Sequence, residues 1–141
     1  MAQKQKSTGM TMELVVNSGR YWEFMRELRN DPHIQQYLIN QVYITKEQQK
    51  AYMEKNEKHY HICLCDSEPA GYIGVKDNEV GLVVATHMQG KGIGRFMLTK
   101  IKDMHPGCYA RIKDDNIASI RLFESCGYKF SHKINNILYY E

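Results

Sequence analysis

Long hydrophobic runs are absent from this 141-residue chain. No stretch approaches the roughly 18 uninterrupted apolar residues of a membrane span, so a membrane is not expected among its partners. The first residues are polar and lack the apolar centre of a secretion signal, which favours a cytoplasmic location. Repeats, low-complexity blocks and internal linkers are also absent. We therefore expect a flexible tail over residues 1–11 and a single domain over residues 12–141.

Cysteine is scarce, with four residues and no Cys-x-x-Cys pair. Cys63 and Cys65 would lie on the same face of one strand, and reduced thiols in a cytoplasmic protein are the simplest interpretation. His59 and His61 would also share a strand face. No cysteine or carboxylate spacing supports these histidines, so we expect no metal site.

An excess of charge of one sign is nearly missing as well. The 19 basic and 16 acidic residues give a formal net charge of +3 and are scattered along the chain. This bias is too weak to indicate nucleic acid as a partner. Hydrophobic residues make up 43% of the sequence, which is ordinary for a globular protein with one core.

Hydrophobic spacing and capping residues divide the chain into strands and helices. In the first half we expect a strand over 12–16, helices over about 21–28, 34–38 and 45–56, and strands over 59–65, 71–75 and 79–85. In the second half we expect a helix ending near 104, a strand over 108–113, a helix over about 117–123 and strands over about 128–131 and 134–140. This order predicts an α/β (α+β) fold in which helices cover a mixed sheet.

The most informative segment reads Gln-Gly-Lys-Gly-Ile-Gly over residues 89–94, between the apolar run 80–85 and a helical pattern. Backbone N–H groups at such a helix N-terminus attract anions, and glycine lets a ligand approach closely. Lys91 and Arg95 add positive charge, which favours a diphosphate. A nucleotide-triphosphate loop is excluded because Gly92 replaces the required Ser or Thr, and a dinucleotide loop is excluded because Arg95 replaces its third glycine.

The remaining pattern is Gln-x-x-Gly-x-Gly, with Gln89, Gly92 and Gly94 in place. It resembles the coenzyme A signature of the GNAT superfamily of N-acetyltransferases. Leu82-Val83-Val84 resembles that family's bulged fourth strand, and the segment from Asn116 to Tyr128 resembles its second motif. The resemblance implies a single GNAT-like domain with a mixed, mostly antiparallel central sheet of six to seven strands and helices on both faces.

The resemblance also implies acetyl-CoA as co-substrate and gives roles to individual positions. The backbone of Leu82, Val83 and Val84 would pair with the pantetheine arm, and the Val84 N–H would stabilise the oxyanion. Asn116 would hydrogen-bond the cofactor arm, and Phe123 would lie beside it. The diphosphate would be held by the loop residues Gln89, Gly90, Lys91, Gly92, Ile93, Gly94 and Arg95. A primary amine would attack directly in a ternary complex, so no cysteine nucleophile is required.

The sequence departs from the family at two positions. Phe123 stands where many members have a tyrosine that protonates the thiolate, so the incoming ammonium, a water, Tyr128 or Tyr139 must supply the proton. Arg111 stands where some members that acetylate ribosomal proteins have a glutamate base. Glu79, which opens the strand toward the acetyl site, is our candidate base through a water.

The acceptor is less legible from the sequence. Segments 28–32 and 44–48 resemble members that acetylate nucleotide-linked amino sugars, and Tyr37, Tyr43 and Tyr52 could contact such a small-molecule substrate. A protein or peptide amine and a small polyamine are alternatives. The alternative that is not an enzyme is a non-catalytic acyl-CoA sensor. Phe123 in place of a tyrosine and Arg111 in place of a glutamate favour this alternative. A homodimer is left open beside a monomer.

Overall fold

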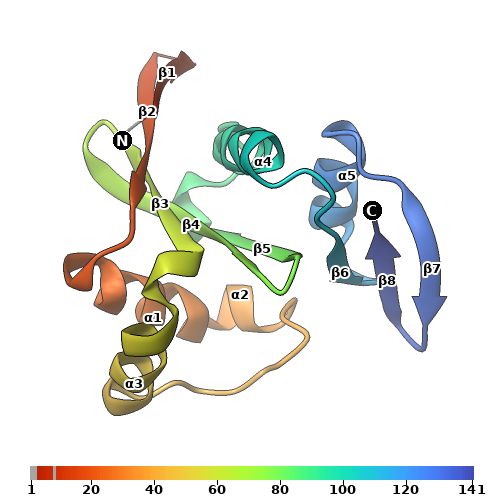
Figure 1. Ribbon diagram of the computed structural model, residues 1–141, viewed down its shortest axis with the longest axis horizontal. Helices are drawn as coiled ribbons and strands as arrows, with labels where there is room; N and C mark the ends of the chain where they lie inside the picture. The colour runs from red at the N-terminus through yellow and green to blue at the C-terminus, as the bar shows by residue number, and fades with distance from the viewer. Residues whose placement is uncertain (1–2, 8) are drawn as a thin grey trace.

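The computed structural model describes residues 3–7 and 9–141, and the side chains from Gly9 onward. In this part of the chain the strands form one antiparallel five-stranded sheet, in the order β1-β2-β3-β4-β5, and one three-stranded sheet, in the order β6-β8-β7 (Figure 1). The strands are β1 (Gln3–Ser7), β2 (Met10–Val16), β3 (Tyr60–Cys65), β4 (Glu68–Lys76), β5 (Glu79–Val84), β6 (Ala110–Lys113), β7 (Phe130–Ile134) and β8 (Ile137–Tyr140). The α-helices are α1 (Trp22–Asn30), α2 (Pro32–Gln35), α3 (Lys46–Asn56), α4 (Ile93–Met104) and α5 (Ile117–Ser125).

A single parallel bridge between Glu79 and Tyr109 joins the two sheets within the described residues. Around it the Val80 N–H donates to the Tyr109 carbonyl at 2.9 Å, and the Tyr109 N–H donates to the Asn78 carbonyl at 2.9 Å. Beyond this point β6 leaves β5, so the ladder cannot continue. The predicted fold class is confirmed, but two sheets replace the expected single sheet of six to seven strands because of this divergence.

The N-terminal segment differs from the prediction of a flexible tail over residues 1–11. Within it Gln3–Ser7 forms β1, which pairs antiparallel with β2, and Gly9 adopts a φ of 78° in the connection. Sequence reasoning missed this strand because Gln-Lys-Gln-Lys-Ser carries no apolar alternation, as is common for an edge strand. Residues 1, 2 and 8 of the predicted tail lie outside the described residues. The domain limits 12–141 stay a prediction.

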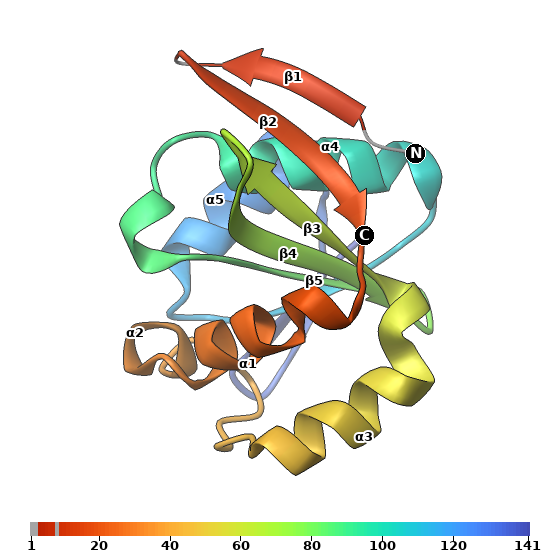
Figure 2. The same cartoon turned by 90° about the vertical axis from the view of Figure 1, so that its left-hand side faces the viewer.

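Two hydrophobic clusters fill the two faces of the five-stranded sheet. Consecutive residues of β3 divide between them, because side chains alternate along a strand. Cys63 packs in the cluster that contains Ile101 of α4, whereas Ile62 packs in the cluster that contains Met25 of α1. Figure 2 shows α4 and α5 on one side of the sheet and α1 and α3 on the other.

Local turn chemistry fixes the β4–β5 and β7–β8 hairpins. The predicted turn at Asp77-Asn78 is present between β4 and β5, with φ of 52° and 65° at its two residues. A second two-residue turn lies between Ile134 and Ile137, with φ of 55° at Asn135. The expected strands over 128–131 and 134–140 are therefore wrong in their limits, because asparagine tolerates positive φ at Asn135 and the hairpin closes later in the chain.

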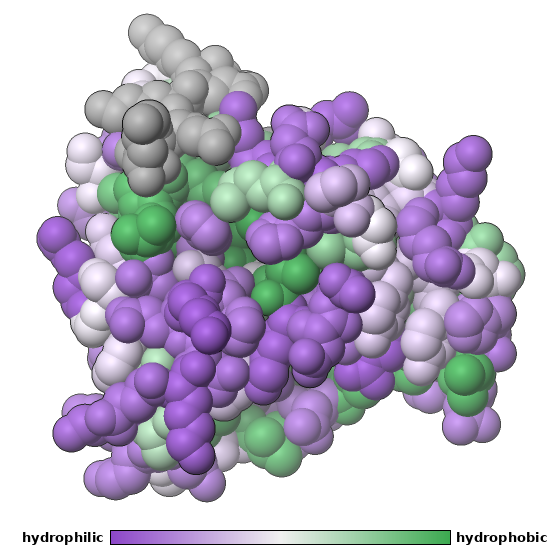
Figure 3. All heavy atoms as spheres, in the orientation of Figure 1, coloured by the Kyte–Doolittle hydropathy of each residue, from purple (hydrophilic) through white to green (hydrophobic). Residues whose placement is uncertain are grey.

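The face of the molecule seen in Figure 3 is mostly hydrophilic, with apolar side chains visible among polar ones toward its middle. None of the helices in the described part of the chain is long and apolar enough to cross a membrane. The same residues contain no group of three or more His, Cys, Asp or Glu side chains arranged to hold a metal ion.

Candidate active site

Beyond the Glu79–Tyr109 bridge β5 and β6 diverge, and we call the space between them the gap. Two pockets meet in this gap. The loop pocket, of about 670 Å³, is lined on one side by the glycine loop and the start of α4, from Gln89 to Arg95 without Lys91. The strand pocket, of about 540 Å³, is lined by β5, β6 and the end of α1. Residues common to both linings include Leu82, Val83 and Asn116, so the two pockets are continuous through the gap.

The glycine loop presents backbone N–H groups to the loop pocket. Gly90 and Gly92 adopt φ of 78° and 85°, conformations that glycine reaches without strain. Gly92 is the N-cap of α4, and the Phe96 N–H donates to its carbonyl at 3.0 Å. The N–H groups of Ile93, Gly94 and Arg95 therefore precede the first helical hydrogen bond and carry the positive end of the helix dipole. This arrangement suits an anion such as a diphosphate.

Side chains of the loop mainly fix its shape. Gln89 Nε2 donates to the Val84 carbonyl at 3.2 Å, which ties the loop to the end of β5. Arg95 Nη1 donates to Ser125 Oγ at 3.0 Å, which ties the start of α4 to α5. Lys91 is exposed and does not line the loop pocket, in contrast to its predicted neighbours.

Gly94 has a packing role in addition to its place in the loop. A Cβ atom at this position would lie 3.0 Å from Leu122 Cδ2 of α5 and 3.7 Å from Leu82 Cδ1 of β5. A larger residue would therefore require the Leu122 side chain to shift, and glycine favours the close approach of α4, α5 and β5. By contrast, a Cβ atom at Gly90 or Gly92 would meet no heavy atom within 4 Å.

The backbone of β5 divides between β4 and the gap. In an antiparallel ladder the N–H and C=O of one residue point to the same side, and successive residues alternate. The Val80 N–H points to β6, and the Ala85 N–H donates to the Ala70 carbonyl of β4 at 2.8 Å. The N–H groups of Leu82 and Val84 thus face the gap, whereas that of Val83 faces β4.

Asn116 and Phe123, both predicted near the cofactor, lie at the gap. Asn116 is the N-cap of α5, where its Oδ1 accepts the Ser119 N–H at 3.3 Å, and it lines both pockets. Phe123 is buried and lines the strand pocket. It packs edge to face on Tyr128, with ring centroids 5.0 Å apart.

The two tyrosines considered as acids do not line either pocket. Tyr128 lies in the core behind Phe123, and burial raises its pKa to about 12. Tyr139 stacks on Tyr109 and on His132, with ring centroids 6.4 Å and 4.3 Å away. Of these aromatic residues Tyr109 reaches the strand pocket, which the sequence did not indicate.

The candidate base Glu79 and the residue Arg111 lie together in the strand pocket. Arg111 Nε donates to Glu79 Oε2 at 2.9 Å, and this contact raises the pKa of Arg111. One carboxylate oxygen of Glu79 is therefore occupied by an ion pair, and Oε1 makes no hydrogen bond within the described residues. Sequence reasoning treated these two positions separately.

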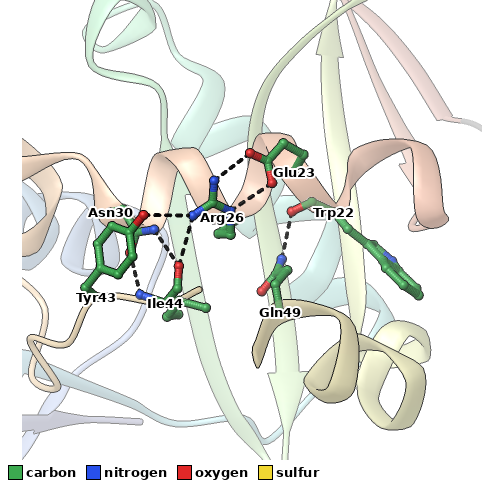
Figure 4. Close-up of polar contacts among 7 residues, drawn as sticks. All are labelled: Trp22, Glu23, Arg26, Asn30, Tyr43, Ile44 and Gln49. Carbon is green, nitrogen blue, oxygen red and sulfur yellow. Dashed lines mark hydrogen bonds and ion pairs between the residues drawn. The ribbon is translucent and has the colours of Figure 1, made fainter. Parts of the chain in front are cut away.

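The segments compared with amino-sugar acetyltransferases have structural roles. Asn30 brackets Ile44, with Nδ2 donating to its carbonyl and Oδ1 accepting its N–H, each at 2.9 Å (Figure 4). Arg26 donates to the same carbonyl at 3.1 Å and to the Tyr43 hydroxyl at 3.2 Å. Thr45 forms a capping box with Gln48 at the start of α3. These contacts hold the connection after α2 against α1.

Of the three tyrosines predicted for the acceptor, Tyr37 lines both pockets, and Tyr43 and Tyr52 line neither. The Tyr52 hydroxyl lies 2.6 Å from that of Tyr60, which does line the strand pocket. Sequence reasoning gave no role to Tyr60 and Tyr72 or to the Arg29 side chain, all of which line this pocket. Tyr60 of β3 and Tyr72 of β4 lie on the sheet face that packs against α1. The alternation of side chains along these strands was the signal that could have indicated it.

Comparison with solved structures gives close matches in fold. A domain from Methanocaldococcus jannaschii superposes with a TM-score of 0.81 at 22% identity, covering 98% of this chain and 97% of that one. The yncA protein of Salmonella typhimurium, solved with its cofactor acetyl-CoA, gives 0.73 at 20% identity and covers 92% and 91%. Spermidine N-acetyltransferase from Vibrio cholerae, solved with CoA and spermine, gives 0.78 at 16% identity and covers 92% of each chain.

No curated protein matched the chain. The model of the Acetyltransferase (GNAT) family matches residues 22–128, which include β5, the glycine loop and α5. This span confirms the family that Gln89, Gly92, Gly94 and Asn116 indicated. The chain belongs to the GNAT family of acetyltransferases and is an acyltransferase.

Proposed function

We propose that this chain transfers the acetyl group of acetyl-CoA to a primary amine by direct attack, with both substrates bound together. The observation that carries the proposal is the meeting of the loop pocket and the strand pocket at the β5 edge, where the Val84 N–H faces the gap. Structural relatives solved with acetyl-CoA or CoA support the same donor. The donor enters along the loop pocket, and the amine enters from the strand pocket.

The loop residues hold the diphosphate through backbone N–H groups, chiefly those from Gly92 to Arg95. Leu82 and Val84 pair through their gap-facing backbone with the pantetheine arm, while Val83 packs beneath it. Asn116 hydrogen-bonds the arm, and Phe123 closes the apolar side next to the thioester. Lys91 contributes long-range positive charge from the exposed loop.

The reaction asks the protein for a base and for an oxyanion donor. The Val84 N–H stabilises the negative charge that forms on the carbonyl oxygen. Glu79 accepts the proton of the attacking ammonium through a water, using the carboxylate oxygen that Arg111 leaves free. Because Phe123 has no acidic proton and Tyr128 is buried away from both pockets, the thiolate receives its proton from the reacting amine or from water.

A nucleotide-linked amino sugar remains the acceptor predicted from the sequence, with a protein or peptide amine and a small polyamine as alternatives. Tyr37 and Tyr109 give the strand pocket aromatic surface that suits a ring-bearing acceptor. The homodimer also remains a prediction.

Release of the CoA thiol on mixing with acetyl-CoA and a panel of amines tests the proposed function. We expect initial-rate lines that intersect when the two substrate concentrations are varied, because both substrates must be bound before the amine attacks. Parallel lines would instead indicate a covalent acetyl-enzyme and would contradict direct attack. Binding of acetyl-CoA without turnover on any amine would contradict catalysis and favour a sensor.

A further inference from the structure

Arg29 lies in the wall of the strand pocket and faces no carboxylate partner among the described residues. It lies in the last turn of α1, is half-buried, and takes part in no ion pair within the described residues. Its Nε atom is fully buried and unsatisfied. An unpaired buried donor on a charged group is costly, so such a group marks a place where a ligand completes the contacts.

The surroundings of Arg29 favour an anion. Tyr60 and Tyr72 line the same pocket, and Arg29 is a charged neighbour that lowers the pKa of both phenols against the rise that burial causes. Burial raises the pKa of Tyr72, and the neighbouring Arg29 guanidinium opposes that rise, which places the cation close to the phenol oxygen. A guanidinium flanked by neutral hydroxyl donors matches the two or three acceptor oxygens of a carboxylate or phosphate.

The other charged residues that line the strand pocket also favour an anionic ligand. Lys76, Asp77, Glu79 and Arg111 are the other charged residues of its lining. Glu79 is neutralised by Arg111 at 2.9 Å, which leaves Asp77, in the exposed hairpin turn, as the carboxylate without an ion pair in the described structure. A polycation would meet Arg29 and Lys76 with little compensation, whereas an anion would meet both favourably.

We infer that Arg29 binds an anionic group of the acceptor, so that the substrate is an amine that also carries a carboxylate or a phosphate. This inference rests on the proposed acetyl transfer and names the substrate class for the same site. The amine of such a molecule reaches the β5 edge near Val84 while its anion stays at the end of α1. Arg29 is thus a specificity-determining residue.

Matched acceptor pairs test the inference and separate the two sources of negative charge. One pair is an amino acid and its amide, and the other is an aminohexose phosphate and the free aminohexose. We expect the anionic member of at least one pair to be preferred by tenfold or more in kcat/KM, and the pair with the larger ratio identifies carboxylate or phosphate. Equal rates on both members of both pairs would overturn the inference.

Variants then assign the preference to Arg29. We expect Arg29→Met to raise the KM of the anionic acceptor by about tenfold to a hundredfold, with a smaller effect on kcat and no effect on the KM of acetyl-CoA. Arg29→Lys keeps the positive charge but not the planar guanidinium group, so its KM for the anionic acceptor should lie between those of the wild type and Arg29→Met. Lys76 is the other cation of the strand pocket that forms no ion pair in the described structure. Lys76→Met is therefore the matched control and should change the preference for the anionic acceptor less than Arg29→Met does.

Stability separates recognition from a structural role of Arg29. A buried cation that waits for a ligand costs the free protein energy, so Arg29→Met should unfold at the same temperature as the wild type or higher. Lower stability with an unchanged acceptor preference would overturn the inference and assign Arg29 to the C-terminus of α1. Turnover of neutral or cationic amines alone would overturn this inference only, whereas no turnover on any amine would contradict the proposed function itself.

Discussion

At the scale of single residues, the chemistry that we propose for the site rests on atoms that have no partner in their own element. The Val84 N–H faces the gap, Oε1 of Glu79 is left open by Arg111, and Nε of Arg29 has no hydrogen-bond partner in the described structure. Regular strands and helices satisfy most of their own polar groups, so these three atoms are available to a substrate. Each of them can be removed by one substitution.

The substitution Val84→Pro deletes the proposed oxyanion donor. Proline lacks the N–H, and this N–H is not part of the β4 ladder, so the strand should keep its pairing. We expect kcat to fall by about 10²-fold to 10³-fold while CoA binds with nearly wild-type affinity by calorimetry. Val84→Ala is the control and should retain most activity. Equal turnover by the proline variant would contradict the assignment of Val84.

The substitution Glu79→Gln tests the candidate base. We expect kcat to fall by about 10²-fold or more, with the acidic limb of the pH-rate profile lost and the KM of acetyl-CoA unchanged. Arg111→Gln breaks the same ion pair but keeps the carboxylate, so it should retain more turnover than Glu79→Gln. An unaltered pH-rate profile in Glu79→Gln would remove this residue from the mechanism.

Tyr128 gives a prediction about pH because its folded-state pKa is raised. Burial takes it from 10.0 to about 12, so the folded state disfavours ionisation. The stabilisation is fully present below pH 10 and is lost as the pH rises toward 12. We expect Tyr128→Phe to weaken this alkaline loss of stability in denaturant titrations and to keep acetyl transfer at neutral pH. Loss of kcat in this variant would restore Tyr128 as a candidate acid.

At the scale of elements, the junction of β5, the glycine loop and α4 forms one unit. The positive φ of Gly92 caps α4 and directs its N–H groups to the loop pocket, while Gly94 lets α5 pack against the helix. The connection after α2 is fixed in the same way, because Asn30 and Arg26 satisfy the backbone of Ile44. Local hydrogen bonds and caps therefore position both the glycine loop and the connection after α2.

The pair Gly92→Asn and Gly92→Val tests the loop. Valine at a φ of 85° is strained by about 1–3 kcal/mol, so it would disturb the cap of α4 as well as the ligand. Asparagine tolerates this conformation and should report the steric effect on the diphosphate alone. We expect Gly92→Asn to weaken CoA binding by tenfold or more by calorimetry, with a near-wild-type melting temperature.

Gly107 offers a matched control for this experiment. It also has positive φ, at 91°, and a Cβ atom there would meet no heavy atom within 4 Å, but it lines neither pocket. Gly107→Asn should therefore bind CoA as the wild type does. If Gly92→Asn also kept wild-type affinity, the diphosphate would not lie against this loop.

At the scale of the whole molecule, the two sheets share one bridge within the described residues, at Glu79 and Tyr109, and lie apart beyond it (Figure 1). A donor bound in that gap would contact β5 on one side and α5 on the other, and so add contacts between the two halves. Ligand that binds only the folded state also stabilises it. We expect CoA to slow amide hydrogen exchange in β6 and β8. Protection confined to α4 would contradict binding across the gap.

Features of the fold that depend on a few adjacent residues could be predicted from the sequence, and the others could not. The glycine loop, the helix caps at Thr45 and Asn116 and the turn at Asp77-Asn78 are written in a few adjacent residues, so their chemistry is visible without a structure. Strand β1 was missed because its polar sequence lacks alternation. The Asn135-Asn136 turn carried a legible signal that the strand assignment overlooked.

The sequence by itself determined the family and predicted the donor side of the site, because a diphosphate is held by backbone groups whose geometry depends on nearby glycines. Only the tertiary structure brought together the residues that we propose for the acceptor side. Glu79 and Arg111 are 32 residues apart, and Arg29, Tyr60 and Tyr72 come from three elements. Such contacts arise when helices pack on a sheet and strands diverge, and no local spacing encodes which side chains then converge.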